Sequence, residues 1–148
     1  MKKFEEIADN LQKYLEILLE ELNNSGFNDI KSIENINGLY VFYENNIAVY
    51  VGRTNRNRMK QRIKEHSAAY SNKNSATFAF KIAKEIKRQP ELKDIDAKDP
   101  DFLLAKERVS KMQVKHIVVN DPIIQTILEP YLAFKLKTME KYNDFMTH

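Results

Sequence analysis

Cysteine is absent from the 148 residues of the chain. Its absence excludes disulfides and zinc sites built from thiolates. A metal ion would have to be held by oxygen or imidazole ligands, and a hard divalent cation such as Mg²⁺ or Mn²⁺ suits that ligand set best.

Long apolar runs are also missing. The chain begins with two lysines, but acidic residues interrupt the apolar positions that follow, at Glu5, Glu6, Glu16, Glu20 and Glu21. We therefore expect neither a membrane span nor a targeting signal, and a cytoplasmic protein. With 43% hydrophobic residues, a chain of this length can build one compact domain.

The net charge of +3 is too small to identify a nucleic-acid partner, but the positive charges are unevenly distributed. No acidic residue interrupts the stretch from Arg53 to Lys64, which holds Arg53, Arg56, Arg58, Lys60, Arg62 and Lys64. Such a stretch is either a solvated helix face or a phosphate-binding face.

The apolar residues between Phe4 and Leu22 recur every three or four positions and are followed by the stop signal Asn23-Asn24-Ser25-Gly26. We expect an amphipathic helix within residues 1–26 that packs on the domain, with packing on another subunit as the alternative.

Two segments rich in β-branched and aromatic residues, Leu39 to Tyr43 and Ile47 to Val51, predict a β-hairpin. If all three intervening residues form the loop, Tyr40 falls opposite Tyr50 on one face. A two-residue loop would separate the two tyrosines unless a bulge restored the register.

The spacing from Met59 to Tyr70 predicts a helix whose buried stripe contains Met59, Ile63 and Tyr70. Arg62 and His66 lie one turn apart along the edge of that stripe.

Further helices are predicted over Ala76 to Lys87, with Phe78, Ile82 and Ile86 inward, and over Phe102 to Lys111. The polar run from Gln89 to Pro100 is the longest candidate for a disordered segment. A strand is expected over Gln113 to Val119.

Asp121-Pro122 predicts the start of a last helix, with aspartate as the cap. We expect Ile123, Ile127 and Tyr131 on its buried side and Glu129 near its polar edge. Pro130 should kink that helix or remove a hydrogen bond.

One set of motifs resembles the GIY-YIG nuclease family over about residues 37–143. It consists of Gly38-Leu39-Tyr40, Tyr50-Val51-Gly52, Arg62, His66 and Glu129. The resemblance implies an α+β fold with a small three-stranded mixed or antiparallel sheet flanked by helices. Residues 37–148 would be the catalytic domain, with a helical insertion at 75–111 and the N-terminal helix as an addition.

The resemblance also implies a role for each matched residue. Glu129 would bind one divalent cation, and Tyr40 would take a proton from the attacking water, which demands a pKa well below about 10. Arg62 would contact the scissile phosphate, His66 would hydrogen-bond the phenol or relay its proton, and Tyr50 would hold the nucleophile or the phosphate.

Other matched positions would support this chemistry. Gly38 and Gly52 flank the tyrosines, and Gly52 would let the strand turn sharply towards a phosphate. Asn143 would orient active-site groups. Backbone phosphates of DNA would be contacted by Arg53, Arg56, Arg58 and Lys60.

The sequence thus predicts a metal-dependent endonuclease that hydrolyses DNA phosphodiester bonds. The alternative is a non-catalytic nucleic-acid-binding module on the same fold, and a third interpretation is a helical interaction protein organised by the N-terminal helix. Because the chain is too short to carry a sizeable recognition domain, a homodimer or a separate partner could supply specificity.

Overall fold

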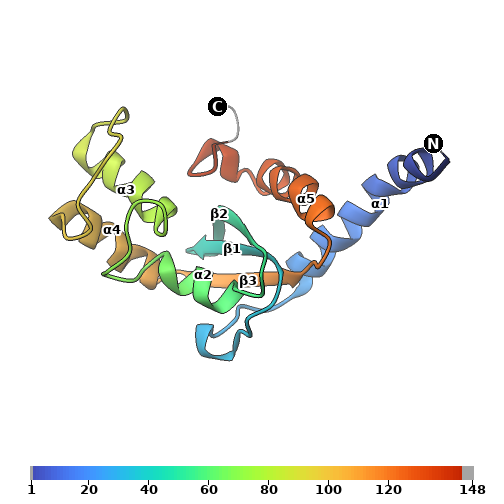
Figure 1. Ribbon diagram of the computed structural model, residues 1–148, viewed down its shortest axis with the longest axis horizontal. Helices are drawn as coiled ribbons and strands as arrows, with labels where there is room; N and C mark the ends of the chain where they lie inside the picture. The colour runs from blue at the N-terminus through green and yellow to red at the C-terminus, as the bar shows by residue number, and fades with distance from the viewer. Residues whose placement is uncertain (1, 145–148) are drawn as a thin grey trace.

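The computed structural model describes residues 2–144, without the side chains of residues 2–4 and 7, and has an α+β fold (Figure 1). Its elements are α1 (Lys2–Asn24), the 3₁₀ turn η1 (Ile30–Ser32), β1 (Gly38–Glu44), β2 (Ile47–Thr54), α2 (Met59–Glu65), α3 (Thr77–Lys87), α4 (Pro100–Ser110), β3 (Gln113–Val118), α5 (Pro122–Lys135) and η2 (Thr138–Glu140). No helix in this part of the chain is long and apolar enough to cross a membrane.

The sheet is antiparallel throughout, with the order β2-β1-β3, which confirms the expected three strands. Side chains alternate between its two faces because successive residues of a strand point in opposite directions. One face, with Leu39 and Val41, packs with leucines of α1 and α5. The other face, with Tyr40 and Phe42, packs with apolar residues of α2, α3 and α4, so helices cover both faces.

The hairpin turn is one residue shorter than the expected three-residue loop. Asn45 and Asn46 both adopt positive φ angles, 53° and 64°, while Glu44 pairs directly with Ile47. Asparagine tolerates this left-handed conformation, which a two-residue turn of this kind requires at both positions. The structure thus selects the two-residue loop of the two alternatives.

A β-bulge restores the arrangement that the longer loop would have given. The register shifts between Phe42 and Tyr43, so that Val49 has no partner opposite. Tyr40 and Tyr50 consequently lie on the same face, although Tyr40 pairs with Gly52 rather than with Tyr50.

Helix α1 packs on the domain through its C-terminal half. Leu15, Leu18 and Leu22 are buried against the sheet and α5. The N-terminal half projects away from the rest of the domain (Figure 1), and Tyr14 and Ile17 are exposed.

Two predicted core positions in the middle of the chain are wrong. Tyr70 is 76% exposed because α2 ends at Glu65, so the helical repeat no longer sets the direction of later side chains. Ile86, in the last turn of α3, is 40% exposed, whereas Phe78 and Ile82 are buried as expected.

Helix α5 matches the predicted orientation only in part. Asp121 caps it, and the half-buried Ile127 and Tyr131 pack against the core as expected, but Ile123 is 71% exposed and Gln125 is completely buried. The Gln125 Nε2 donates hydrogen bonds to the carbonyl oxygens of Val119, at 2.6 Å, and Thr54, at 3.3 Å. These bonds fix the helix so that Leu128 and Leu132 point into the core. The helix continues through Pro130.

The polar segment between α3 and α4 is anchored to the domain. Lys106 of α4 is buried, and its Nζ donates to the carbonyl oxygens of Ala69, at 3.0 Å, Ser71, at 2.6 Å, and Ala97, at 2.9 Å. This one ammonium group therefore ties the loop before α3 to the segment that we expected to be the best candidate for disorder.

Candidate active site

Tyr40, on the central strand, is the centre of a buried aromatic cluster. It lies opposite Gly52, and a Cβ atom at Gly52 would overlap the phenol ring of Tyr40. We had expected Gly52 to let the strand turn, but it lies inside β2. Its missing side chain instead makes room for the Tyr40 ring. A Cβ atom at Gly38 would similarly overlap the Ile117 carbonyl of β3.

His66 forms a hydrogen bond with Tyr40, as the family resemblance implied. The Tyr40 Oη lies 2.7 Å from the His66 Nε2, and both residues are buried. His66 occupies the cap position after α2 and has the rings of Phe42 and Tyr50 within about 5.5 Å. Its Nδ1 is buried without a hydrogen-bond partner among residues 2–144.

Burial makes both members of this pair neutral. It lowers the pKa of His66 well below 6.5, and the positive charge of Arg62 lowers it further. Burial also raises the pKa of Tyr40 well above 10, with further increases from Tyr50 and Glu129 that outweigh the lowering by Arg62. The expectation of a depressed tyrosine pKa was therefore wrong, because desolvation dominates over the neighbouring positive charge.

Tyr50 connects the buried cluster to an open cavity. Its ring stacks on Phe78 of α3, with centroids 4.6 Å apart and an interplanar angle of 3°. Burial and the nearby Glu129 raise the pKa of Tyr50 to about 12. Tyr50 therefore presents a protonated hydroxyl at neutral pH.

The cavity has a volume of about 730 Å³ and lies between β2, α3, α5 and the C-terminal segment. Its walls are formed by Tyr50, Arg53, Thr77, Lys81, Lys84, Thr126, Glu129, Pro130, Asn143 and Asp144. Four residues of the predicted site, Tyr50, Arg53, Glu129 and Asn143, thus meet here. Tyr40 and His66 are buried next to Tyr50, and neither they nor the half-buried Arg62 line the cavity.

Glu129 is largely buried and faces Arg53 across the cavity wall. The Arg53 Nε lies 3.2 Å from the Glu129 Oε2, but this oxygen has no well-aligned hydrogen-bond donor among residues 2–144. Burial raises the pKa of Glu129, although Arg53 and Lys81 lower it. Glu129 is therefore a largely buried carboxylate whose Oε2 is ion-paired with Arg53 but unused as a hydrogen-bond acceptor.

That unused oxygen suits a hard divalent cation. The described residues contain no cluster of three or more acidic or histidine side chains that could hold a metal ion. Magnesium often binds through one or two carboxylates, keeping several waters and substrate phosphate oxygens as its other ligands. Glu129 fits this sparse type of site, and Asp144 is a second carboxylate on the same cavity.

Arg62 is held beside the buried cluster. Its guanidinium donates to the Ser75 carbonyl and lies 3.4 Å from the Glu65 carboxylate. Its charge lowers the pKa of both Tyr40 and Tyr50, which places the guanidinium near their hydroxyls.

The predicted DNA contacts separate into two groups. Arg53 lines the cavity and also donates to Thr126 Oγ1 at 2.7 Å. Arg56, Arg58 and Lys60 lie away from the cavity, on the turn after β2 and the start of α2. Arg58 is already paired with Glu65 at 2.6 Å.

Asn143 braces the edge strand beside Tyr50. Its Oδ1 accepts from the Val51 amide at 2.7 Å, and its Nδ2 donates to the Val51 carbonyl at 2.8 Å. The side chain thus replaces a neighbouring strand at this position of β2, and it fixes the backbone that carries Tyr50.

Sequence reasoning missed the contribution of α3 to the site. Thr77, Lys81 and Lys84 line the cavity, and their spacing of four and three residues places them on one face of the helix. That stripe could be recognised in the sequence. However, no local sequence signal places this stripe near Glu129, because residues 75–111 were interpreted as a helical insertion outside the catalytic part of the domain.

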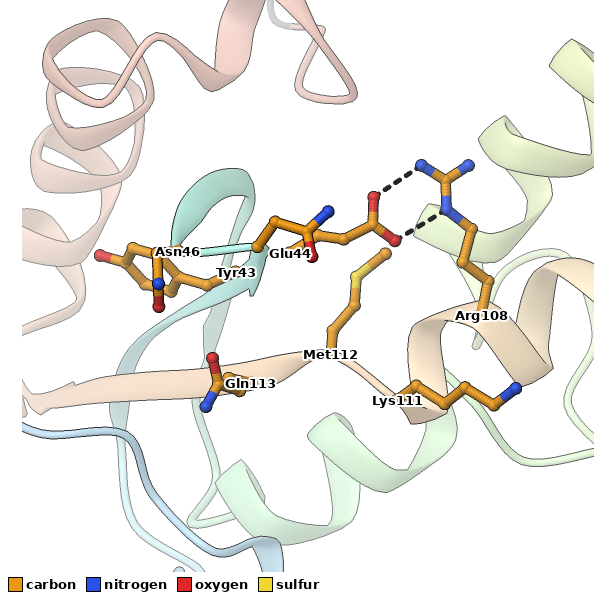
Figure 2. A pocket seen from close by; sticks show the side chains of 8 residues that line it. Tyr43, Glu44, Asn46, Arg108, Lys111, Met112 and Gln113 are labelled. Carbon is orange, nitrogen blue, oxygen red and sulfur yellow. Dashed lines mark hydrogen bonds and ion pairs between the residues drawn. The ribbon is translucent and has the colours of Figure 1, made fainter.

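A second hollow, of about 560 Å³, lies at the hairpin turn and the end of α4 (Figure 2). Its main polar feature is a bidentate ion pair in which Arg108 donates to Glu44 at 2.9 and 2.7 Å. The pair satisfies both groups, and this hollow contains none of the predicted site residues.

Comparisons with known proteins were negative: no family model matches the chain, and neither does any curated protein or solved structure.

Proposed function

We propose that the chain is a metal-dependent endonuclease of the GIY-YIG type that hydrolyses DNA phosphodiester bonds. The observation that carries the proposal is the hydrogen-bonded pair of Tyr40 and His66. This pair is linked through Tyr50 to a cavity that also holds the Glu129 carboxylate. These residues come from β1, the end of α2, β2 and α5, and phosphodiester hydrolysis needs each of these group types.

The proton route begins at the attacking water. Tyr40 accepts its proton while passing the phenol proton to the neutral Nε2 of His66, so no free phenolate is needed at rest. Burial keeps the phenol of Tyr40 protonated at rest, and because burial also lowers the pKa of His66, the imidazole would hold the proton only during the transfer. The water oxygen forms its bond to phosphorus as the bond to the 3′ oxygen breaks. The departing oxygen takes up a proton from a water molecule, and His66 returns its proton to solvent through Tyr40, which restores the resting pair.

Glu129 would hold the cation, and a bound divalent cation would polarise the phosphate and stabilise the departing oxygen. The present partner of Glu129, Arg53, is 42% exposed. It can therefore turn from the carboxylate to a phosphate oxygen. Arg62 adds positive charge near the tyrosines, where negative charge accumulates on the phosphoryl group.

Plasmid cleavage tests this proposal directly. Supercoiled plasmid is incubated with the protein and Mg²⁺ or Mn²⁺, with a chelator in a parallel reaction. We expect cleavage only with metal, and a loss of at least about 100-fold in rate for Tyr40→Phe and for Glu129→Gln. Lys111→Gln, a charge change at the exposed residue that follows α4, is the control. Metal-dependent cleavage that neither site variant reduces would reject the site.

A non-catalytic nucleic-acid-binding module is the second candidate, and one observation favours it. Tyr40 is only 1% exposed and does not line the cavity, so a water must pass Tyr50 to reach its hydroxyl. DNA binding that persists with no cleavage, across single- and double-stranded substrates and both metals, would select this candidate.

A further inference from the structure

The face of α3 that borders the cavity carries two lysines whose charges are weakly compensated. The Lys81 Nζ donates to the Tyr142 carbonyl at 2.7 Å and lies 6.0 Å from the Tyr50 ring centroid. The Lys84 Nζ lies 5.2 Å from the centroid of the Phe80 ring. Within residues 2–144, Lys84 forms no ion pair.

The next lysine of the same helix shows the contrast. Lys87 contacts two carboxylates, Asp99 at 3.0 Å and Asp101 at 2.9 Å, and so serves the connection between α3 and α4. Lys81 and Lys84 are half-buried and face the cavity instead. Burial lowers the pKa of Lys81 although the charges of Asp144 and Glu129 raise it, so an anionic ligand beside the two lysines would offset part of the free-energy cost of burying their ammonium groups.

The other cavity residues include complementary groups. Arg53 and Thr126, which are hydrogen-bonded to each other, line the same cavity as the two lysines, together with Tyr50 and Glu129. An anion at Lys81 and Lys84 would thus lie beside the residues proposed to act on the scissile phosphate.

We propose that Lys81 and Lys84 bind backbone phosphates of the DNA strand next to the phosphate held at Glu129. The two lysines are three residues apart and lie on one face of α3, so their ammonium groups can contact neighbouring phosphates of one strand. The strand would run between α3 and α5. This inference rests on the proposed function and adds the path of the substrate.

This path of the DNA strand along α3 differs from the path predicted from the sequence, which followed the basic residues at the end of β2 and after it. Arg58 is neutralised by Glu65, whereas Lys84 has no acidic partner in the described chain. The α3 wall should therefore contribute more to phosphate binding than Arg58.

Salt-dependent DNA binding tests the path without relying on cleavage. A fluorescent 16-base-pair duplex is titrated with the protein in chelator at several salt concentrations. The double variant Lys81→Gln/Lys84→Gln should reduce the log-log slope by about 1.8, since each phosphate contact on duplex DNA contributes about 0.9. It should also weaken binding at low salt by about tenfold or more.

Matched variants separate charge from structure. Lys81→Arg/Lys84→Arg keeps both charges and should retain the wild-type slope, while Lys111→Gln and Arg58→Gln should change it by less than the double variant. Thermal unfolding of each variant checks that the fold is retained.

The outcomes distinguish this inference from the proposed function. Wild-type protein that binds and cleaves DNA, with an unchanged slope in the glutamine double variant, overturns the α3 path alone. Wild-type protein that neither binds nor cleaves DNA overturns both. A slope that falls in Arg58→Gln but not in the glutamine double variant would place the strand on the turn after β2 and also overturn the α3 path.

Discussion

Gly52 and Tyr40 lie directly opposite each other in the hairpin, and the phenol ring occupies the space that any side chain at position 52 would need. This relationship aims the Tyr40 hydroxyl at His66, 2.7 Å away. A glycine in one motif thus positions the tyrosine of the other.

Gly52→Ala should destabilise the protein by about 1–3 kcal/mol, because the new methyl group overlaps the buried ring. Urea unfolding measures the change. Gly26→Ala is the control, because a Cβ atom there meets nothing within 4 Å. Equal unfolding midpoints for the two variants would refute the packing relationship.

His66 should make the stability of the protein depend on pH. Its folded pKa lies below the unfolded value of about 6.5, so between these pKa values the unfolded chain binds the additional proton. The contribution of neutral His66 to the free energy of unfolding is fully present above about pH 6.5. It falls as the pH is lowered below that value, by up to about 1.4 kcal/mol per pH unit.

Denaturant midpoints at pH 7 and pH 5 measure this dependence by comparing wild type with His66→Gln. The variant should lose less stability on acidification, and His116→Gln separates the contribution of the half-buried His116, whose pKa burial also lowers. Identical pH dependence in wild type and His66→Gln would show that His66 is not buried as a neutral group.

Asn143→Ala should cost about 1–3 kcal/mol, because it removes both hydrogen bonds to the Val51 backbone. Amide hydrogen exchange of Val51 should accelerate as well. The exposed Asn10 offers a control, Asn10→Ala, which should leave the Val51 exchange rate unchanged. Protection that survives in Asn143→Ala would show that the edge strand does not depend on this side chain.

Lys106→Met should destabilise the protein by about 2–4 kcal/mol, since three carbonyl oxygens lose their shared donor. Limited proteolysis should then cut between α3 and α4 sooner than in wild type. Lys111→Met, on the exposed end of the same helix, provides the comparison. Unchanged cleavage of that segment would mean that Lys106 does not anchor it.

Local spacing was sufficient to locate the helices and strands and to predict the cap of α5, but it placed the end of α2 five residues too late. Asp121 caps that helix because aspartate before proline satisfies the first free amide groups, whatever the helix packs against. The rotation of α5 was not predictable from spacing, because the buried Gln125 bonds to carbonyl groups of β2 and of the segment after β3.

The sequence by itself determined the order of the motif residues, the antiparallel hairpin and the candidate carboxylate at Glu129. Only the tertiary structure decided the bulged register, the raised pKa of Tyr40 and the facing of Lys81 and Lys84 towards the cavity. The physical reason is that the helix and strand repeats act over short distances along the chain and fix only which side chains share a face of one element. Burial and the electrostatic environment depend instead on contacts with elements that are distant in the sequence.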